Sequence, residues 1–120
     1  MNYPLSELID RYSILLLKKE RLPEDKSLGL QLSLLKSAIR AYNYPWSFLF
    51  VDKFLKVNGK IWDLESDIRK GREKLLGLTE VGRRAIAIRE LNKERISIKN
   101  DVAKKVGDFQ DIKIDHASQG

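Results

Sequence analysis

The fold is decided by residues 46–70, WSFLFVDKFLKVNGKIWDLESDIRK. Apolar side chains recur in this stretch at alternating steps of four and three residues. They are Phe50, Phe54, Val57, Ile61, Leu64 and Ile68. This spacing is typical of a long helix with a coiled-coil-like seam. The seam needs a second helix to cover it.

The partner is expected over residues 79–106, with Thr79 as N-cap and Gly107 as C-cap. Its seam consists of Ile88, Leu91, Ile98 and Val102, with Arg84 and Arg95 at the steps between. Residues 72–76 lie between two glycines and show a weaker helical pattern. They are expected either to fray or to form one further helical turn. Two long helices with a short connection pack antiparallel.

Two shorter helices are expected before this hairpin, over residues 4–21 and 27–42, where Pro23 and Pro45 mark the breaks. The sequence therefore predicts an all-α protein, an antiparallel helical bundle built on a long helical hairpin. Residues 1–107 form one domain in which the first two helices cover the seam. Residues 108–120 form a C-terminal tail, either an extended arm or a short strand.

Composition excludes several chemistries. Among 120 residues there is no cysteine and one histidine, His116. Disulfides, thiol catalysis, zinc fingers and Ser-His-Asp triads are therefore disfavoured, and we expect no metal and no cofactor. The longest apolar run near the N-terminus, residues 14–17, is too short for a signal peptide or a membrane span. We expect a cytoplasmic protein with no membrane partner.

The positive charge is concentrated in one segment. The chain carries +6, but residues 69–105 alone carry twelve Lys and Arg against five acids, or +7. Such a field attracts anions, although a solvated helix with internal ion pairs explains the same pattern. The aromatic residues 42–48 are not interleaved with the basic run and no nucleic-acid motif is present, so nucleic acid is a disfavoured partner.

A polar stripe runs beside the seam of residues 46–70. It consists of Asn58, Trp62, Glu65 and Arg69, and the partner helix offers Asn92, Arg95 and Lys99 at similar spacing. In an antiparallel hairpin that turns near residue 75, Asn58 lies near Asn92. Asp10 and Arg11 are further polar candidates on the first helix, and Tyr12 on the same helix offers a ring for stacking.

The stripe has two interpretations. It is an internal network that fixes helix register, as buried Asn does in coiled coils, or it is a ligand pocket between helices. In the second case Arg69, Arg95 and Lys99 bind phosphate or carboxylate. The asparagines bind a base or sugar, and an aromatic ring stacks on the ligand. The candidate ligand-binding residues are Asp10, Tyr12, Asn58, Trp62, Glu65, Arg69, Asn92, Arg95 and Lys99.

Three stretches resemble a family of small helical proteins of unknown function from bacteria and phages, some of them encoded beside glycosyltransferases. The first is Leu5-Ser6-Glu7-Leu8-Ile9-Asp10-Arg11-Tyr12-Ser13-Ile14-Leu15. The others are Asn58-x-x-Ile61-Trp62-Asp63-Leu64-Glu65-Ser66-Asp67-Ile68-Arg69 and Ile88-x-x-Leu91-Asn92-x-x-Arg95-x-x-Ile98-Lys99. The family has no settled activity, so the resemblance implies the helical fold and the importance of the stripe. In size, helix content and charge, the chain is also similar to phage proteins that sequester cyclic nucleotide immune signals.

Three functions follow as hypotheses. The first is a non-enzymatic, homo-oligomeric protein that binds an anionic, nucleotide-like small molecule, as a phage sponge for an immune signal would. The second is a scaffold module that works with a glycosyltransferase or a larger assembly and docks through Trp46, Phe48 or the tail. The third is a Mg²⁺-dependent nucleotide hydrolase that uses Asp10, Asp63, Glu65 and Asp67. Cations on the facing helix count against that metal site, so catalytic residues are not assigned.

Overall fold

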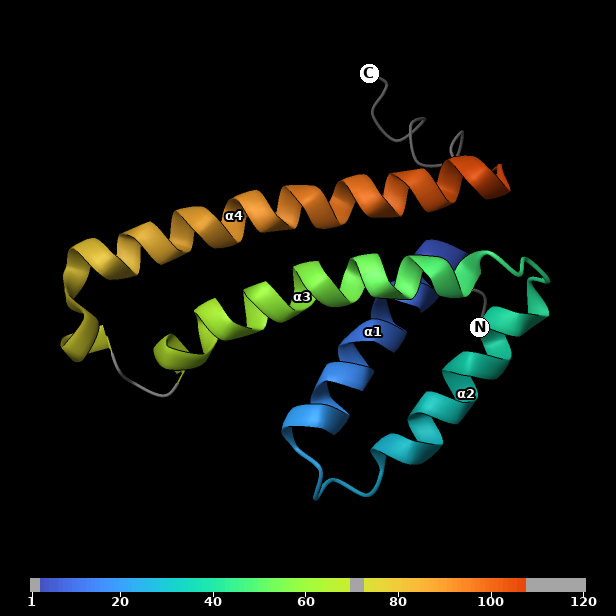
Figure 1. Cartoon of the computed structure of the whole chain (residues 1–120), viewed down its shortest axis with the longest axis horizontal. Helices are drawn as coiled ribbons and strands as arrows, with labels where there is room; N and C mark the ends of the chain where they lie inside the picture. Colours follow the sequence, from blue (N-terminus) through green and yellow to red (C-terminus); the bar gives the residue numbers. More distant parts are fainter. Residues whose placement is uncertain (1–2, 70–72, 108–120) are drawn as a thin grey trace.

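The computed structural model is all-α and describes residues 3–69 and 73–107, with side chains for residues 3–66 and 77–107 (Figure 1). Its helices are α1 (Leu5–Arg21), α2 (Leu28–Ala41), α3 (Ser47–Arg69) and α4 (Glu73–Val106). The predicted helical bundle is therefore confirmed, and the tail at residues 108–120 lies outside the described residues. In the described part of the chain, none of the helices combines the length and apolar character that a bilayer crossing requires.

The long hairpin is formed by α3 and α4, which lie side by side in opposite directions (Figure 1). Helix α1 crosses this pair and contacts both helices. The main core forms where the three helices meet, because each presents an apolar face there. Its buried members are Leu5, Leu8, Ile9, Ile39, Phe50, Val51, Phe54 and Val102.

The expectation that both short helices cover the seam needs correction. Helix α2 packs mainly against α1, and Ile39 is its buried residue in the main core. The burial of the seam residues therefore decreases along α3. Phe54 is fully buried, whereas Leu64, nearly three turns later, is half-buried. The last turns of α3 and the first turns of α4 extend beyond α1 and α2 (Figure 1).

The start of α4 also differs from the expectation. The helix begins at Glu73 rather than near Thr79, and it is interrupted at Gly77, whose φ of 80° and ψ of 158° are not helical. This backbone region is open essentially to glycine alone. The weaker stretch therefore forms one further turn, and the break lies two residues before the predicted N-cap.

Gly107 ends α4 with a φ of 86°, and its N–H donates to the carbonyl of Lys104. We expect Gly107→Ala to lower the free energy of unfolding by about 1 kcal/mol, because a Cβ disfavours left-handed backbone. Gly82→Ala is the matched control. A Cβ there meets nothing within 4 Å, so the exposed helical position gains about 0.5–1 kcal/mol from helix propensity. Urea unfolding measures the free energy of unfolding of both variants. If both substitutions stabilised the chain, or both destabilised it, the assignment of Gly107 as the C-cap would be contradicted.

Candidate ligand-binding cleft

A fully buried carboxylate, Asp10 of α1, lies at the junction of α1, α3 and α4. From α3, the Nδ2 of Asn58 donates a hydrogen bond to its Oδ1 over 2.9 Å. From α4, Arg95 donates through Nε and Nη2, with 3.0 Å from Nε to Oδ2. The Nζ of Lys99 lies 3.3 Å from Oδ2. A buried charge is tolerated only when it is paired and hydrogen-bonded in this way.

Helix periodicity explains why these groups meet. Arg95 and Lys99 stand one turn apart on α4, so both face α1. On α1, the hydroxyl of Ser13 donates to the carbonyl of Asp10 over 2.7 Å and accepts from Asn58 over 2.9 Å. The amide of Asn58 is thus shared between a carboxylate and a hydroxyl on one helix. This geometry fixes the crossing of α1 over α3.

The charges around Asp10 decide its ionisation. Burial raises the pKa of its carboxyl, but the hydrogen bonds from Arg95 and Asn58 and the nearby positive charges outweigh burial. The pKa of Asp10 is therefore below its ordinary value, and the carboxylate is ionised at neutral pH. The hydrogen bonds that Arg95 donates to Asp10 raise the pKa of Arg95.

A second ion-pair cluster lies one turn before Asp10. Glu7 accepts from Lys99 over 2.9 Å and from Arg11 over 3.1 Å. Partial burial raises the pKa of Glu7, and the two cations lower it more, so the net shift is downward. Lys99 consequently forms ion pairs with both Glu7 and Asp10.

A polar cleft of about 350 Å³ lies beside this network, between α1, α3 and α4. Its lining residues are Ile14, Leu17, Asn58, Ile61, Trp62, Glu65, Asn92 and Arg95. The cleft therefore combines an indole ring, two amides, a carboxylate and a guanidinium with three aliphatic side chains. Its volume is within the range of small-molecule sites.

The structure thus brings five of the nine predicted residues into one cleft. Asp10 and Lys99 are next to it, because Asp10 binds Asn58 and Arg95, which line the cleft. Tyr12 is not among the lining residues and packs against Phe48, with ring centroids 6.1 Å apart. The side chain of Arg69 lies outside the described residues.

Two side chains of this polar network were not identified as candidates from the sequence. Ser13 lies one turn after Asp10, and Glu7 lies one turn before it. The common spacing of three residues places all three on one face of α1. Polar residues on the apolar face of a helix were the signal that could have identified them.

Among the carboxylates considered for a metal site, those with described side chains do not gather around one point. Asp10 is bound by two cations, and Asp63 pairs with Arg21 over 2.5 Å. The side chain of Asp67 lies outside the described residues. In the part of the chain with described side chains, no group of three or more His, Cys, Asp or Glu is placed to hold a metal ion.

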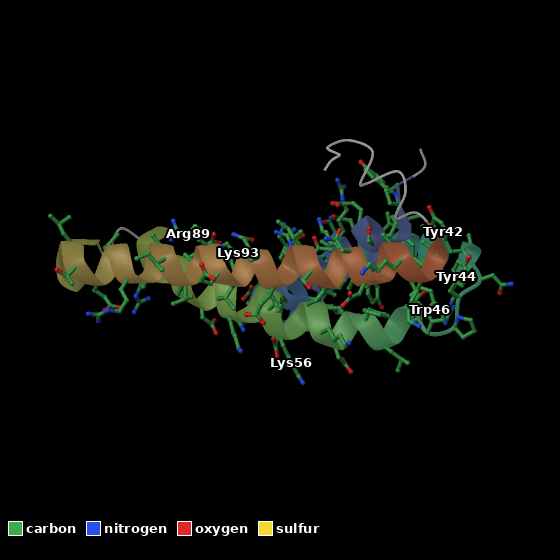
Figure 2. All side chains as sticks on the ribbon, turned by 90° about the horizontal axis from the view of Figure 1, so that it is seen from above. Tyr42, Tyr44, Trp46, Lys56, Arg89 and Lys93 are labelled. Carbon is green, nitrogen blue, oxygen red and sulfur yellow. The ribbon has the colours of Figure 1, made fainter. Side chains whose placement is uncertain are left out.

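Three aromatic residues of the segment before α3 gather at one end of the molecule. Tyr42, Tyr44 and Trp46 lie where α3 begins and α4 ends, away from Arg89 and Lys93 near the middle of α4 (Figure 2). Lys105, at the end of the basic segment, lies close to them, with its Nζ 5.2 Å from the ring centroid of Trp46.

Comparisons of the chain with protein-family models, curated proteins and solved structures find no match. The family resemblance stays a prediction.

Proposed function

We propose that this protein is a non-enzymatic binding protein that holds an anionic, nucleotide-like small molecule in the polar cleft. The observation that carries the proposal is the composition of the cleft walls. Trp62 offers a face for stacking, Asn92 offers an amide for a base or sugar, and Arg95 offers a guanidinium for an anion. Such a protein acts by holding its ligand.

The position of Arg95 is set by Asp10, which accepts from its Nε and Nη2. A guanidinium held by a second group is preorganised, so less side-chain entropy is lost when a ligand binds. Asp10 is therefore a positioning residue. Arg95 lines the cleft, whereas Lys99 pairs with Glu7 and Asp10 and is not among the lining residues, so the direct contact with the ligand anion is assigned to Arg95.

Glu65 orients the ligand in the same cleft. Its carboxylate repels an anion and attracts a hydrogen-bond donor. Because Glu65 raises the pKa of Arg95 through its charge, the two groups lie within electrostatic reach of each other. The ligand that fits presents an anionic group to Arg95 and a donor, such as an amino group or a sugar hydroxyl, to Glu65. A nucleotide has both groups and a ring for Trp62.

Isothermal titration with linear and cyclic mononucleotides and dinucleotides tests the proposal. We expect one of these probes to bind, and Trp62→Ala to weaken it about 10-fold or more, because stacking on an aromatic ring contributes roughly 1–3 kcal/mol per base. Asn92→Ala should weaken binding as well. Neither residue contacts Asp10 in the buried network, so these variants are preferable to Arg95→Ala, which leaves a buried carboxylate without its main partner.

Lys93→Ala is the matched control. Lys93 is exposed on α4 and pairs with Glu90 over 3.2 Å, so its removal should leave the affinity unchanged. The proposal fails if none of the nucleotides gives heat, or if Lys93→Ala weakens binding as much as Trp62→Ala.

A further inference from the structure

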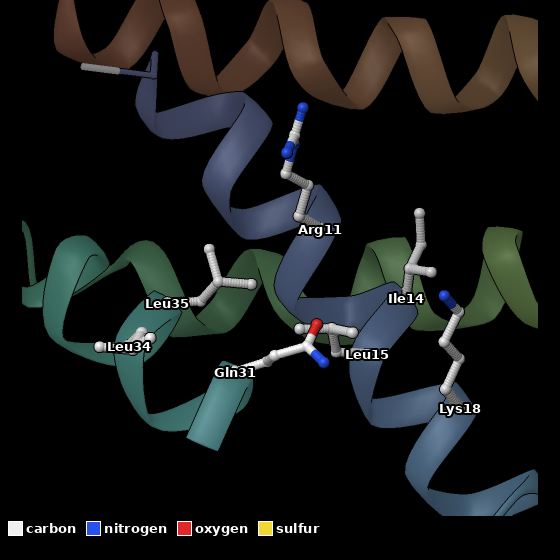
Figure 3. Close-up of a pocket in the computed structure, with 7 residues that line it drawn as sticks. All are labelled: Arg11, Ile14, Leu15, Lys18, Gln31, Leu34 and Leu35. Carbon is white, nitrogen blue, oxygen red and sulfur yellow. The ribbon is translucent and has the colours of Figure 1, made fainter. Parts of the chain in front are cut away.

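An open groove of about 390 Å³ lies between α1 and α2 (Figure 3). Four apolar side chains line it, Ile14 and Leu15 from α1 and Leu34 and Leu35 from α2. Its polar lining side chains are Arg11, Lys18 and Gln31. The described residues that line the groove thus include two cations and no carboxylate.

The apolar surface of α2 is wider than α1 can cover. Leu28, Leu32 and Ile39 are buried, whereas Leu30 and Leu34, one turn apart, are 67% and 62% exposed. Adjacent exposed leucines beside a groove are typical of a surface that another segment covers.

A second copy of the same face is a poor occupant. Lys18 lies on the α1 side of the groove together with Arg11, which also pairs with Glu7. The charged residues of α2 are Lys36 and Arg40. Two such faces would bring cations against cations, which costs binding energy. Charge complementarity therefore favours an acidic segment with apolar side chains.

The chain carries such a segment itself. Residues 108–115, DFQDIKID, contain three aspartates and one lysine, for a net charge of −2. They also contain Phe109, Ile112 and Ile114.

The segment is also long enough. It directly follows the end of α4, where Val106 packs against the main core cluster. Leu35, which lines the groove, packs against the same cluster. Eight extended residues span about 26 Å. The segment can therefore reach the groove from the end of α4.

We propose that residues 108–115 dock into the groove between α1 and α2 of their own chain. Their apolar side chains cover Leu34 and Leu35, and their aspartates approach Arg11 and Lys18. The groove shares Ile14 with the polar cleft, but the proposed contact requires no ligand there.

Paramagnetic broadening in NMR spectra tests the contact. The chain has no cysteine, so Ser118→Cys provides one attachment point for a nitroxide label just beyond the segment. We expect the amides of Ile14, Lys18 and Leu34 to lose most of their signal intensity. The amide of Gly82, on the part of the hairpin beyond α1 and α2, should keep its intensity.

Two controls make the result specific. With the label in place, Lys18→Glu should restore much of the lost intensity, whereas Lys56→Glu on the exposed face of α3 should not. Mixing labelled chains with isotope-enriched unlabelled chains reports contacts between copies. The proposal is overturned if the groove amides keep their intensity, if they broaden only in the mixed sample, or if the two Lys variants behave alike.

Discussion

Asp10→Asn is expected to lower the free energy of unfolding by about 3 kcal/mol or more at neutral pH. The substitution keeps the shape of the side chain and removes its charge. Asp10 is fully buried, so the positive charges of Arg95 and Lys99 lose the carboxylate that compensates for their own partial burial. The new amide also places donor hydrogens near the donors of Asn58 and Arg95. Urea unfolding followed by circular dichroism measures the change.

Asp52→Asn is the matched control, because Asp52 is an exposed aspartate on α3. Its removal should change the stability by less than about 0.5 kcal/mol. A similar loss in both variants would contradict the special role of Asp10.

The pH dependence gives a second readout of the same variant. The pKa of Asp10 is lower in the folded chain than its ordinary value. The stabilisation is therefore complete above the unfolded-state pKa and is lost as the pH falls through the folded-state pKa. The stability difference between the wild-type chain and Asp10→Asn should consequently shrink in acid. A difference that stays constant down to low pH would show that the carboxylate charge does not stabilise the fold.

The fold could be predicted because its signals are local. The seam from Phe50 to Ile61 follows from helical periodicity, and Gly107 terminates α4 because glycine alone adopts its backbone conformation easily. The position of α2 could not be predicted in this way. The apolar face of α2 is wide enough to pack against either α1 or the hairpin. Which of these contacts forms depends on the helix crossing angles, and the spacing of apolar residues in the sequence does not determine those angles.

The same distinction applies to the candidate site. The spacing of Asn58 and Trp62 on α3, and of Asn92 and Arg95 on α4, correctly indicated that these side chains share one region. The partner of Arg95 is Asp10, 85 positions earlier in the chain. That contact depends on how α1 crosses the hairpin. Sequence spacing left an internal network and a ligand pocket as alternatives. The structure contains the network and a cleft beside it, and Asn58 and Arg95 belong to each.

Phe54→Ala is expected to lower the free energy of unfolding by about 3–5 kcal/mol, the range found when a fully buried phenylalanine is truncated. Phe54 is completely buried in the main core, which joins residues of all four helices. The cavity that the lost ring leaves can collapse only if α1 or α4 moves, and the buried network around Asp10 opposes that movement. Urea unfolding measures the effect. Leu49→Ala, at a position 71% exposed on the same helix, should cost less than about 0.5 kcal/mol.

The two large effects should not be additive. Phe54 lies one helical turn before Asn58, whose amide donates to Asp10. Truncating the ring loosens this turn of α3 and lets water approach the carboxylate, so less stability is left for Asp10→Asn to remove. The double variant should therefore lose less than the sum of the two single losses, by about 0.5 kcal/mol or more. Strict additivity would mean that the apolar core and the buried ion pair stabilise the helix crossing independently.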